Sequence, residues 1–145
     1  MQIDNIEEIK KILPQRYPFL MIDRVIELKP AESATAIKNV TINDWFFEGH
    51  FPGRPVMPGT LLIEAMAQTS ILIYYSAYEA NLKPKPEYYL GSIKARFLNP
   101  VFPGDQLKII AGVEKLLPQG AFVACKAMVD EKLVAEADLV FAVKQ

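Results

Sequence analysis

The stretch TLLIEAMAQTSILIYYSAY, residues 60–78, decides the fold, because apolar side chains cover almost every side of the helix that it predicts. A helix without a polar face must be surrounded by protein. The chain offers segments rich in β-branched and aromatic residues that read as strands: 20–29, 33–42, 88–98, 105–117, 121–130 and 133–144. Short turn signals between them favour antiparallel neighbours. We therefore expect an α+β fold in which a curved antiparallel sheet wraps one central helix.

The composition describes a globular chain with a balanced charge. Residues 1–145 are expected to form a single domain, with 51% hydrophobic and 23% charged residues. The 16 basic residues against 17 acidic ones argue against a nucleic-acid binder. No apolar segment is long enough for a membrane span, and the N-terminus lacks the pattern of a signal peptide. With Cys125 as the lone cysteine, expected to be a small buried residue, the sequence predicts a cytoplasmic protein.

The segment GHFPGRPVMPGTLLIEAMAQ, residues 49–68, contains His50, the only histidine of the chain. Its three prolines restrict the backbone, and its glycines at positions 49, 53 and 59 allow conformations closed to other residues. We expect this loop to fix His50 in place. The amides near Gly59 and Thr60 are expected at the positive end of the helix, where they can bind an anion or a polarised carbonyl.

Glu64 and Gln68 follow at helical spacing and are expected to share one face of the helix. Burial would raise the pKa of the Glu64 carboxyl and make it a proton donor near neutral pH, with histidine as the natural base. A base, an acid and backbone donors suit proton abstraction next to a carbonyl. A structural role for either His50 or Glu64 is the alternative. One histidine without a cysteine pair predicts no metal site.

The segment FFEGHFPGRPVMPGTLLIEAMAQ, residues 46–68, closely resembles the signature of bacterial 3-hydroxyacyl-acyl-carrier-protein dehydratases of the FabZ type. LPQRYPFLMIDRV, residues 13–25, and ARFLNPVFPGDQL, residues 95–107, resemble the flanking blocks of that family. The resemblance implies the hotdog fold and dehydration of a (3R)-3-hydroxyacyl chain on acyl carrier protein to the trans-2-enoyl thioester, in type II fatty-acid synthesis. It implies no cofactor.

The resemblance also implies roles for individual residues. His50 would remove the α-proton, Glu64 would help the β-hydroxyl leave as water, and the Gly59 amide would bind the thioester carbonyl. Gln68 would orient Glu64. The family builds its site between two subunits, His50 of one facing Glu64 of the other, and commonly assembles as a trimer of dimers.

Two further sets of residues are candidates by the same resemblance. An apolar tunnel for the acyl chain would be lined by Tyr88, Tyr89 and Phe97, either tyrosine being the gate; packing within the sheet is the alternative for both. Contacts with the acidic carrier protein would come from Arg54, Lys94 and Arg96, for which a solvated surface is the alternative.

The sequence departs from the family pattern at Gln15, where a histidine is usual, and at Ser92 and Ile93, which replace an apolar–acidic pair. The helix acid is Glu64, whereas the dehydratase–isomerase branch (the FabA type) carries Asp. Glutamate therefore favours plain dehydration. Two other functions stay open: a hotdog acyl thioesterase, which would release a free thiol, and a non-catalytic subunit that binds acyl carrier protein.

Overall fold

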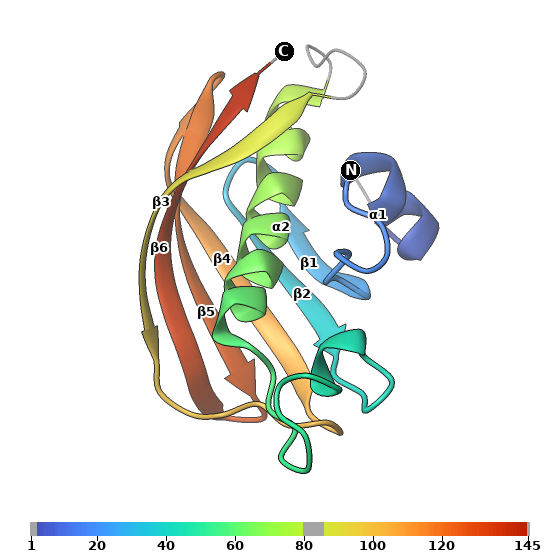
Figure 1. The fold of residues 1–145 in the computed structure, drawn as a ribbon. Coiled ribbons are helices and arrows are strands. Elements are labelled where there is room, and N and C mark those ends of the chain that lie inside the picture. Colours follow the sequence, from blue (N-terminus) through green and yellow to red (C-terminus); the bar gives the residue numbers. More distant parts are fainter. Residues whose placement is uncertain (1–2, 80–85, 145) are drawn as a thin grey trace.

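The computed structural model describes residues 3–79 and 86–144, in which the long helix α2 packs on one face of a six-stranded sheet (Figure 1). The elements in chain order are α1 (Ile6–Ile12), β1 (Arg24–Lys29), β2 (Ser33–Asn39), the 3-10 turn η1 (Trp45–Phe47), α2 (Gly59–Tyr78), β3 (Glu87–Phe97), β4 (Gln106–Leu117), β5 (Gly120–Val129) and β6 (Lys132–Lys144). The predicted α+β fold, with one central helix wrapped by a curved antiparallel sheet, is confirmed.

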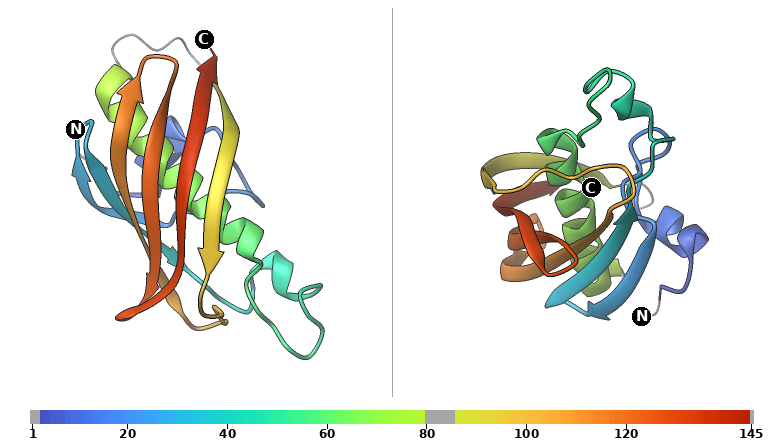
Figure 2. Two further views of the ribbon diagram at one scale, coloured as in Figure 1. Left: turned by 90° about the vertical axis from the view of Figure 1, so that its left-hand side faces the viewer. Right: turned by 90° about the horizontal axis from the view of Figure 1, so that it is seen from below.

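The sheet has the strand order β1-β2-β4-β5-β6-β3, and every neighbouring pair is antiparallel. Strands β4, β5 and β6 follow one another as hairpins, while α2 carries the chain across to β3 at the far edge (Figure 2). The first strand begins at Arg24, later than predicted. The reason is that the Met21 amide donates to Oε1 of Gln68 on α2 (2.8 Å) instead of to a neighbouring strand.

Helix α2 forms the centre of the core. Its middle is buried from Ala65 to Tyr74 apart from half-buried Ala67, and Thr60 is its one exposed residue. The sheet covers one side of α2, and the N-terminal part of the chain with α1 lies on the other (Figure 1). Cys125 is 2% exposed, as expected for a small core residue, and burial raises the pKa of its thiol to about 11. None of the helices within 3–79 and 86–144 is both long and apolar enough to cross a membrane.

The turn between β4 and β5 depends on Gly120. Its φ is +158°, and a Cβ placed there would lie 2.1 Å from the carbonyl oxygen of Phe141 on β6. We expect Gly120→Ala to lower the free energy of unfolding by about 2–4 kcal/mol, because backbone strain and overpacking add. Urea denaturation measures this. Gly112→Ala in β4 is the matched control, since its new methyl group would meet nothing within 4 Å. Equal stability of the two variants would contradict the prediction.

Candidate active site

His50 belongs to the segment between η1 and α2. This segment forms a loop that projects beyond the end of the sheet, at the N-terminal end of α2 (Figure 1). The loop has its own hydrogen bonds: Phe51 and Arg54 exchange two backbone bonds (3.1 and 2.8 Å), and the Val56 amide donates to the His50 carbonyl (3.0 Å). Met57 then ties the loop to the body of the protein by donating to the Val101 carbonyl (2.8 Å). These bonds hold the backbone around His50 in one conformation.

The glycines of this loop serve different purposes, which corrects the expectation that all of them supply unusual backbone conformations. Gly53 has a φ of +74° and needs glycine for its turn. A Cβ on Gly49 would meet nothing within 4 Å, and neither Gly49 nor Gly59 has a positive φ. Gly59 is needed for space instead, because a Cβ there would lie 2.8 Å from the ring of Phe97 on β3.

The contacts of the His50 ring determine which nitrogen is available for chemistry. Nδ1 lies 2.8 Å from the carbonyl oxygen of Val56, and the ring stacks on Phe51 with 3.9 Å between centroids. A carbonyl oxygen can only accept, so Nδ1 carries the proton in this bond. In the neutral ring Nε2 is then unprotonated and is the ring nitrogen able to accept a proton, as the predicted role of His50 as a base requires.

The His50 side chain shares a pocket of about 660 Å³ with the start of α2. Its other lining residues are Phe19, Trp45, Phe46, Glu48, Gly49, Pro58, Thr60 and Leu61. The amides of Gly59 and Thr60 precede the first helical hydrogen bonds, which Leu61 and Leu62 donate to the Pro58 carbonyl. The pocket combines apolar walls with an imidazole and the positive end of a helix. It therefore suits a ligand in which a polar group is attached to an apolar chain.

Glu64 and Gln68 form the hydrogen-bonded pair that their spacing predicts. Gln68 Nε2 donates to Glu64 Oε2 (2.8 Å) and to the Phe19 carbonyl (2.6 Å). Burial raises the pKa of the half-buried Glu64 carboxyl, and the hydrogen bond from Gln68 lowers it by a smaller amount. The carboxyl therefore holds its proton to higher pH than an exposed glutamate, which suits a proton donor.

Within one chain, Glu64 is absent from the residues that line the His50 pocket. The structure thus brings His50 together with Pro58, Thr60 and Leu61 at the start of α2, and separately pairs Glu64 with Gln68. Gly59, the predicted donor, lies between two of these residues in sequence but does not itself line the pocket. Among residues 3–79 and 86–144, no group of three or more His, Cys, Asp or Glu side chains could hold a metal ion. That no cofactor takes part stays a prediction.

The two tyrosine candidates point to opposite faces of the sheet. Tyr88 packs edge-on against Tyr74 of α2 and Phe141 of β6, and its hydroxyl is buried without a hydrogen-bond partner among the described residues. Burial raises the pKa of Tyr88 to about 12. Tyr89 is 51% exposed and donates to Glu87. Of the two, Tyr88 lies beside α2.

Phe97, the third tunnel candidate, lies against Gly59 near the His50 end of α2.

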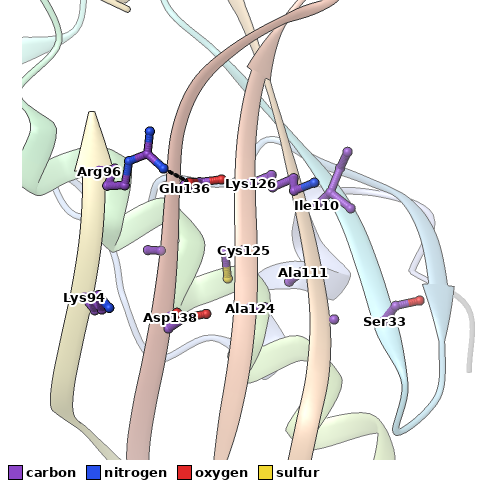
Figure 3. A pocket seen from close by; sticks show the side chains of 12 residues that line it. Ser33, Lys94, Arg96, Ile110, Ala111, Ala124, Cys125, Lys126, Glu136 and Asp138 are labelled. Atoms are coloured by element: carbon purple, nitrogen blue, oxygen red, sulfur yellow. Dashed lines mark hydrogen bonds and ion pairs between the residues drawn. The ribbon is translucent and has the colours of Figure 1, made fainter. Parts of the chain in front are cut away.

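The basic candidates lie in two places. Arg54 is exposed on the His50 loop. Lys94 and Arg96 lie on the face of the sheet away from α2, where they line a pocket of about 620 Å³ (Figure 3). Arg96 forms an ion pair with Glu136 (3.0 Å), and Lys94 lies across the ladder from Asp138. Acidic neighbours thus offset the charge of these two residues, while Arg54 forms hydrogen bonds through its backbone to Phe51.

Gln15 and Ile93, two of the positions that depart from the family pattern, lie in different environments. Gln15 has its Oε1 atom buried without a hydrogen-bond partner among the described residues. Ile93 is 42% exposed on β3, the edge strand.

Sequence reasoning missed two aromatic walls of the His50 pocket, Phe19 and Trp45. Trp45 is the only tryptophan of the chain and lies shortly before the GHFPG segment, which is a signal that could have marked it. Its indole Nε1 donates to the Pro18 carbonyl (2.8 Å). Phe19 lies far from the pocket in sequence, and no local pattern predicts its place there.

Comparison with known proteins identifies related sequences along almost the whole chain. A family model described as FabA-like domain matches residues 13–138. A curated 3-hydroxyacyl-acyl-carrier-protein dehydratase FabZ of Geotalea uraniireducens is 49% identical over 137 residues, 93% of each chain. The corresponding protein of Clostridium botulinum (strain Okra) is 45% identical over 139 residues, 96% of this chain and 95% of the relative.

Solved structures share the fold at much lower identity. The dehydratase heterocomplex ApeI:P from Xenorhabdus doucetiae matches with a TM-score of 0.80 and 14% identity over 94% of this chain and 91% of that one. A hypothetical thioesterase with coenzyme A from Streptococcus pneumoniae matches with a TM-score of 0.63 and 11% identity, over 83% and 84%. These likenesses confirm the expected hotdog fold.

Proposed function

Because the chain belongs to the family of FabA-like domains, and within it to the 3-hydroxyacyl-acyl-carrier-protein dehydratases of the FabZ type, we propose that it dehydrates (3R)-3-hydroxyacyl-acyl carrier protein to the trans-2-enoyl thioester in fatty-acid biosynthesis. The observation that carries the proposal is the 49% identity to a curated dehydratase over 93% of both chains. The enzyme is a lyase that needs acyl carrier protein as the carrier of its substrate.

In the proposed mechanism, His50 Nε2 takes a proton from the carbon next to the thioester carbonyl. The Gly59 amide donates a hydrogen bond to the carbonyl oxygen, where negative charge develops. Glu64 gives its proton to the hydroxyl group on the β-carbon. The C–O bond then breaks, water leaves, and the electron pair of the broken C–H bond forms the double bond. The Nδ1 contact of His50 and the raised pKa of Glu64 support these two assignments.

We also propose that each site is shared between two subunits, His50 from one and Glu64 from the other. Two observations support this. The loop that contains His50 projects beyond the end of the sheet, and Glu64 of the same chain does not line the His50 pocket (Figure 1). The edge strand β3 leaves three large apolar side chains half exposed, Leu90 (42%), Ile93 (42%) and Phe97 (53%). An unpaired apolar edge of this kind needs cover from another chain.

The finer features of the family are proposals of the same kind. Three such dimers would assemble as a trimer of dimers. The acyl chain would extend from the His50 pocket along Phe97, with Tyr88 as the gate because it is the tyrosine that lies beside α2. Arg54 is the favoured contact for the acidic carrier protein, since it lies on the His50 loop, and Lys94 and Arg96 would contribute less because they face acidic residues. A cytoplasmic location stays a prediction.

Incubation with (3R)-3-hydroxyacyl-acyl carrier protein, followed by mass spectrometry of the acyl carrier, tests the function. We expect the loss of one water from the acyl chain, with the thioester intact. Free fatty acid would instead identify the thioesterase alternative. Binding of the carrier without any change of the acyl chain would identify the non-catalytic alternative. Either of these results would contradict the proposed dehydration.

A further inference from the structure

The segment Pro18–Met21 is bound from two directions by side chains that belong to different parts of the site. Trp45 Nε1 donates to the Pro18 carbonyl (2.8 Å). Gln68 Nε2 donates to the Phe19 carbonyl (2.6 Å), and Gln68 Oε1 accepts from the Met21 amide (2.8 Å). The backbone of these four consecutive residues thus forms three hydrogen bonds with side chains, one with Trp45 in η1 and two with Gln68 in α2.

The Gln68 end of this network reaches the candidate acid. Gln68 is fully buried on α2, and its Nε2 donates to Glu64 Oε2 (2.8 Å) as well as to the segment. Both donor hydrogens of the amide are therefore used, and its oxygen holds the Met21 amide. The position of the Glu64 carboxylate depends on where Pro18–Met21 holds Gln68.

The Trp45 end reaches the loop of the candidate base. Trp45 is the first residue of η1, and two residues, Glu48 and Gly49, lie between this turn and His50 in the sequence. Trp45 and His50 also line the same pocket. The turn is anchored to β2 by the ion pair of Lys38 with Asp44 (3.0 Å), whose side chains are 7% and 17% exposed. An ion pair so little exposed holds its geometry far more firmly than a surface pair.

We propose that Trp45 is a positioning residue that, through Pro18–Met21 and Gln68, couples the loop of His50 to the carboxylate of Glu64. The expected effect on kinetics rests on the proposed function, whereas the coupling itself is a property of the folded chain. In the proposed dimer, His50 and Glu64 of one chain belong to two different active sites. The network within that chain therefore connects the two sites. The alternative is that the indole only covers the N-terminal segment.

The first test uses kinetics. Trp45→Phe keeps an aromatic ring against Phe46, which it meets edge-on at 5.7 Å, and removes the Nε1 donor. We expect kcat to fall about tenfold with KM within about twofold, since misplacing catalytic groups slows the chemical step more than it weakens binding. Tyr17→Phe is the control, because Tyr17 is 86% exposed beside the segment and lies outside the network. Unchanged kcat in Trp45→Phe would overturn the proposal.

The second test needs no activity. Trp45 is the only tryptophan, so the full chain labelled with ¹⁵N-tryptophan has one indole N–H resonance in its NMR spectrum. We expect Glu64→Gln to shift this resonance. Glu136→Gln on β6 is the matched control, because it makes the same substitution on the opposite face of the sheet and should leave the resonance in place. An unmoved indole resonance in folded Glu64→Gln would overturn the coupling.

The two tests separate the inference from the proposed function. A parent protein that leaves the hydroxyacyl thioester unchanged would refute the proposed function, while the indole resonance would still report on the coupling. A parent with full dehydratase activity, and an indole resonance that ignores Glu64→Gln, would refute the coupling alone.

Discussion

Replacement of His50 by alanine is expected to lower turnover by about 10²–10⁴-fold, the usual contribution of a general base. The reason is specific to the ring contacts. The Val56 carbonyl fixes the proton on Nδ1, so Nε2 is the basic atom of the ring, and the chain has no second histidine to replace it. Initial rates with (3R)-3-hydroxyacyl-acyl carrier protein measure the effect.

A second variant separates loss of the base from loss of loop structure. His50→Asn offers an amide N–H that can replace the Nδ1 donor to the Val56 carbonyl, while it has no basic nitrogen. We expect it to be as inactive as His50→Ala. Circular dichroism and light scattering should show that both variants are folded and assembled like the parent. Parent-like turnover in either folded variant would remove His50 from the mechanism.

Most of the fold could be predicted from the sequence because one feature determines it. A helix that is apolar on all sides leaves few arrangements, and α2 begins one residue before the predicted Thr60 and ends at the predicted Tyr78. The errors lie where tertiary hydrogen bonds replace strand pairing. The Met21 amide binds Gln68, so the first strand is shorter than its residue pattern indicates.

The candidate site was predictable only in its local parts. The pairing of Glu64 with Gln68 follows from helical spacing, and the stiffness of the His50 loop follows from its prolines and glycines. The crowding of Gly59 by Phe97 and the placement of Phe19 beside His50 depend on contacts between distant segments. Of the cis peptide bonds at Tyr17–Pro18 and His50–Phe51, the first is one of several X–Pro bonds that could be cis, and no sequence signal marks the second.

Replacement of Glu64 by glutamine is expected to lower turnover by at least about 100-fold, because the amide keeps the shape of the side chain and has no proton to give. In the parent, activity should fall as the pH rises through the pKa of Glu64, since the protonated carboxyl is the active form. Burial raises that pKa, so the parent stays active to higher pH than an exposed glutamate would allow. The residual activity of Glu64→Gln should lack this limb of the pH–rate profile.

The same substitution is expected to leave stability unchanged or to increase it at neutral pH. With its pKa raised on folding, the Glu64 carboxyl binds protons more tightly in the folded state, and its contribution to stability falls as the pH rises through the folded pKa. Glutamine has no such dependence. Urea denaturation at several pH values measures the difference. A large loss of stability in Glu64→Gln would instead assign the carboxylate a structural role.

Mixing the two inactive variants shows whether the low turnover of Glu64→Gln arises at a site shared between subunits. In a mixed dimer of His50→Ala and Glu64→Gln chains, one site carries both substitutions, while the other combines His50 of one chain with Glu64 of its partner and is intact. Refolding the variants together should therefore restore activity toward half of the parent value per mixed dimer. Sites contained within single chains would regain nothing. That outcome would place His50 and Glu64 of the same chain in one site and contradict the shared arrangement.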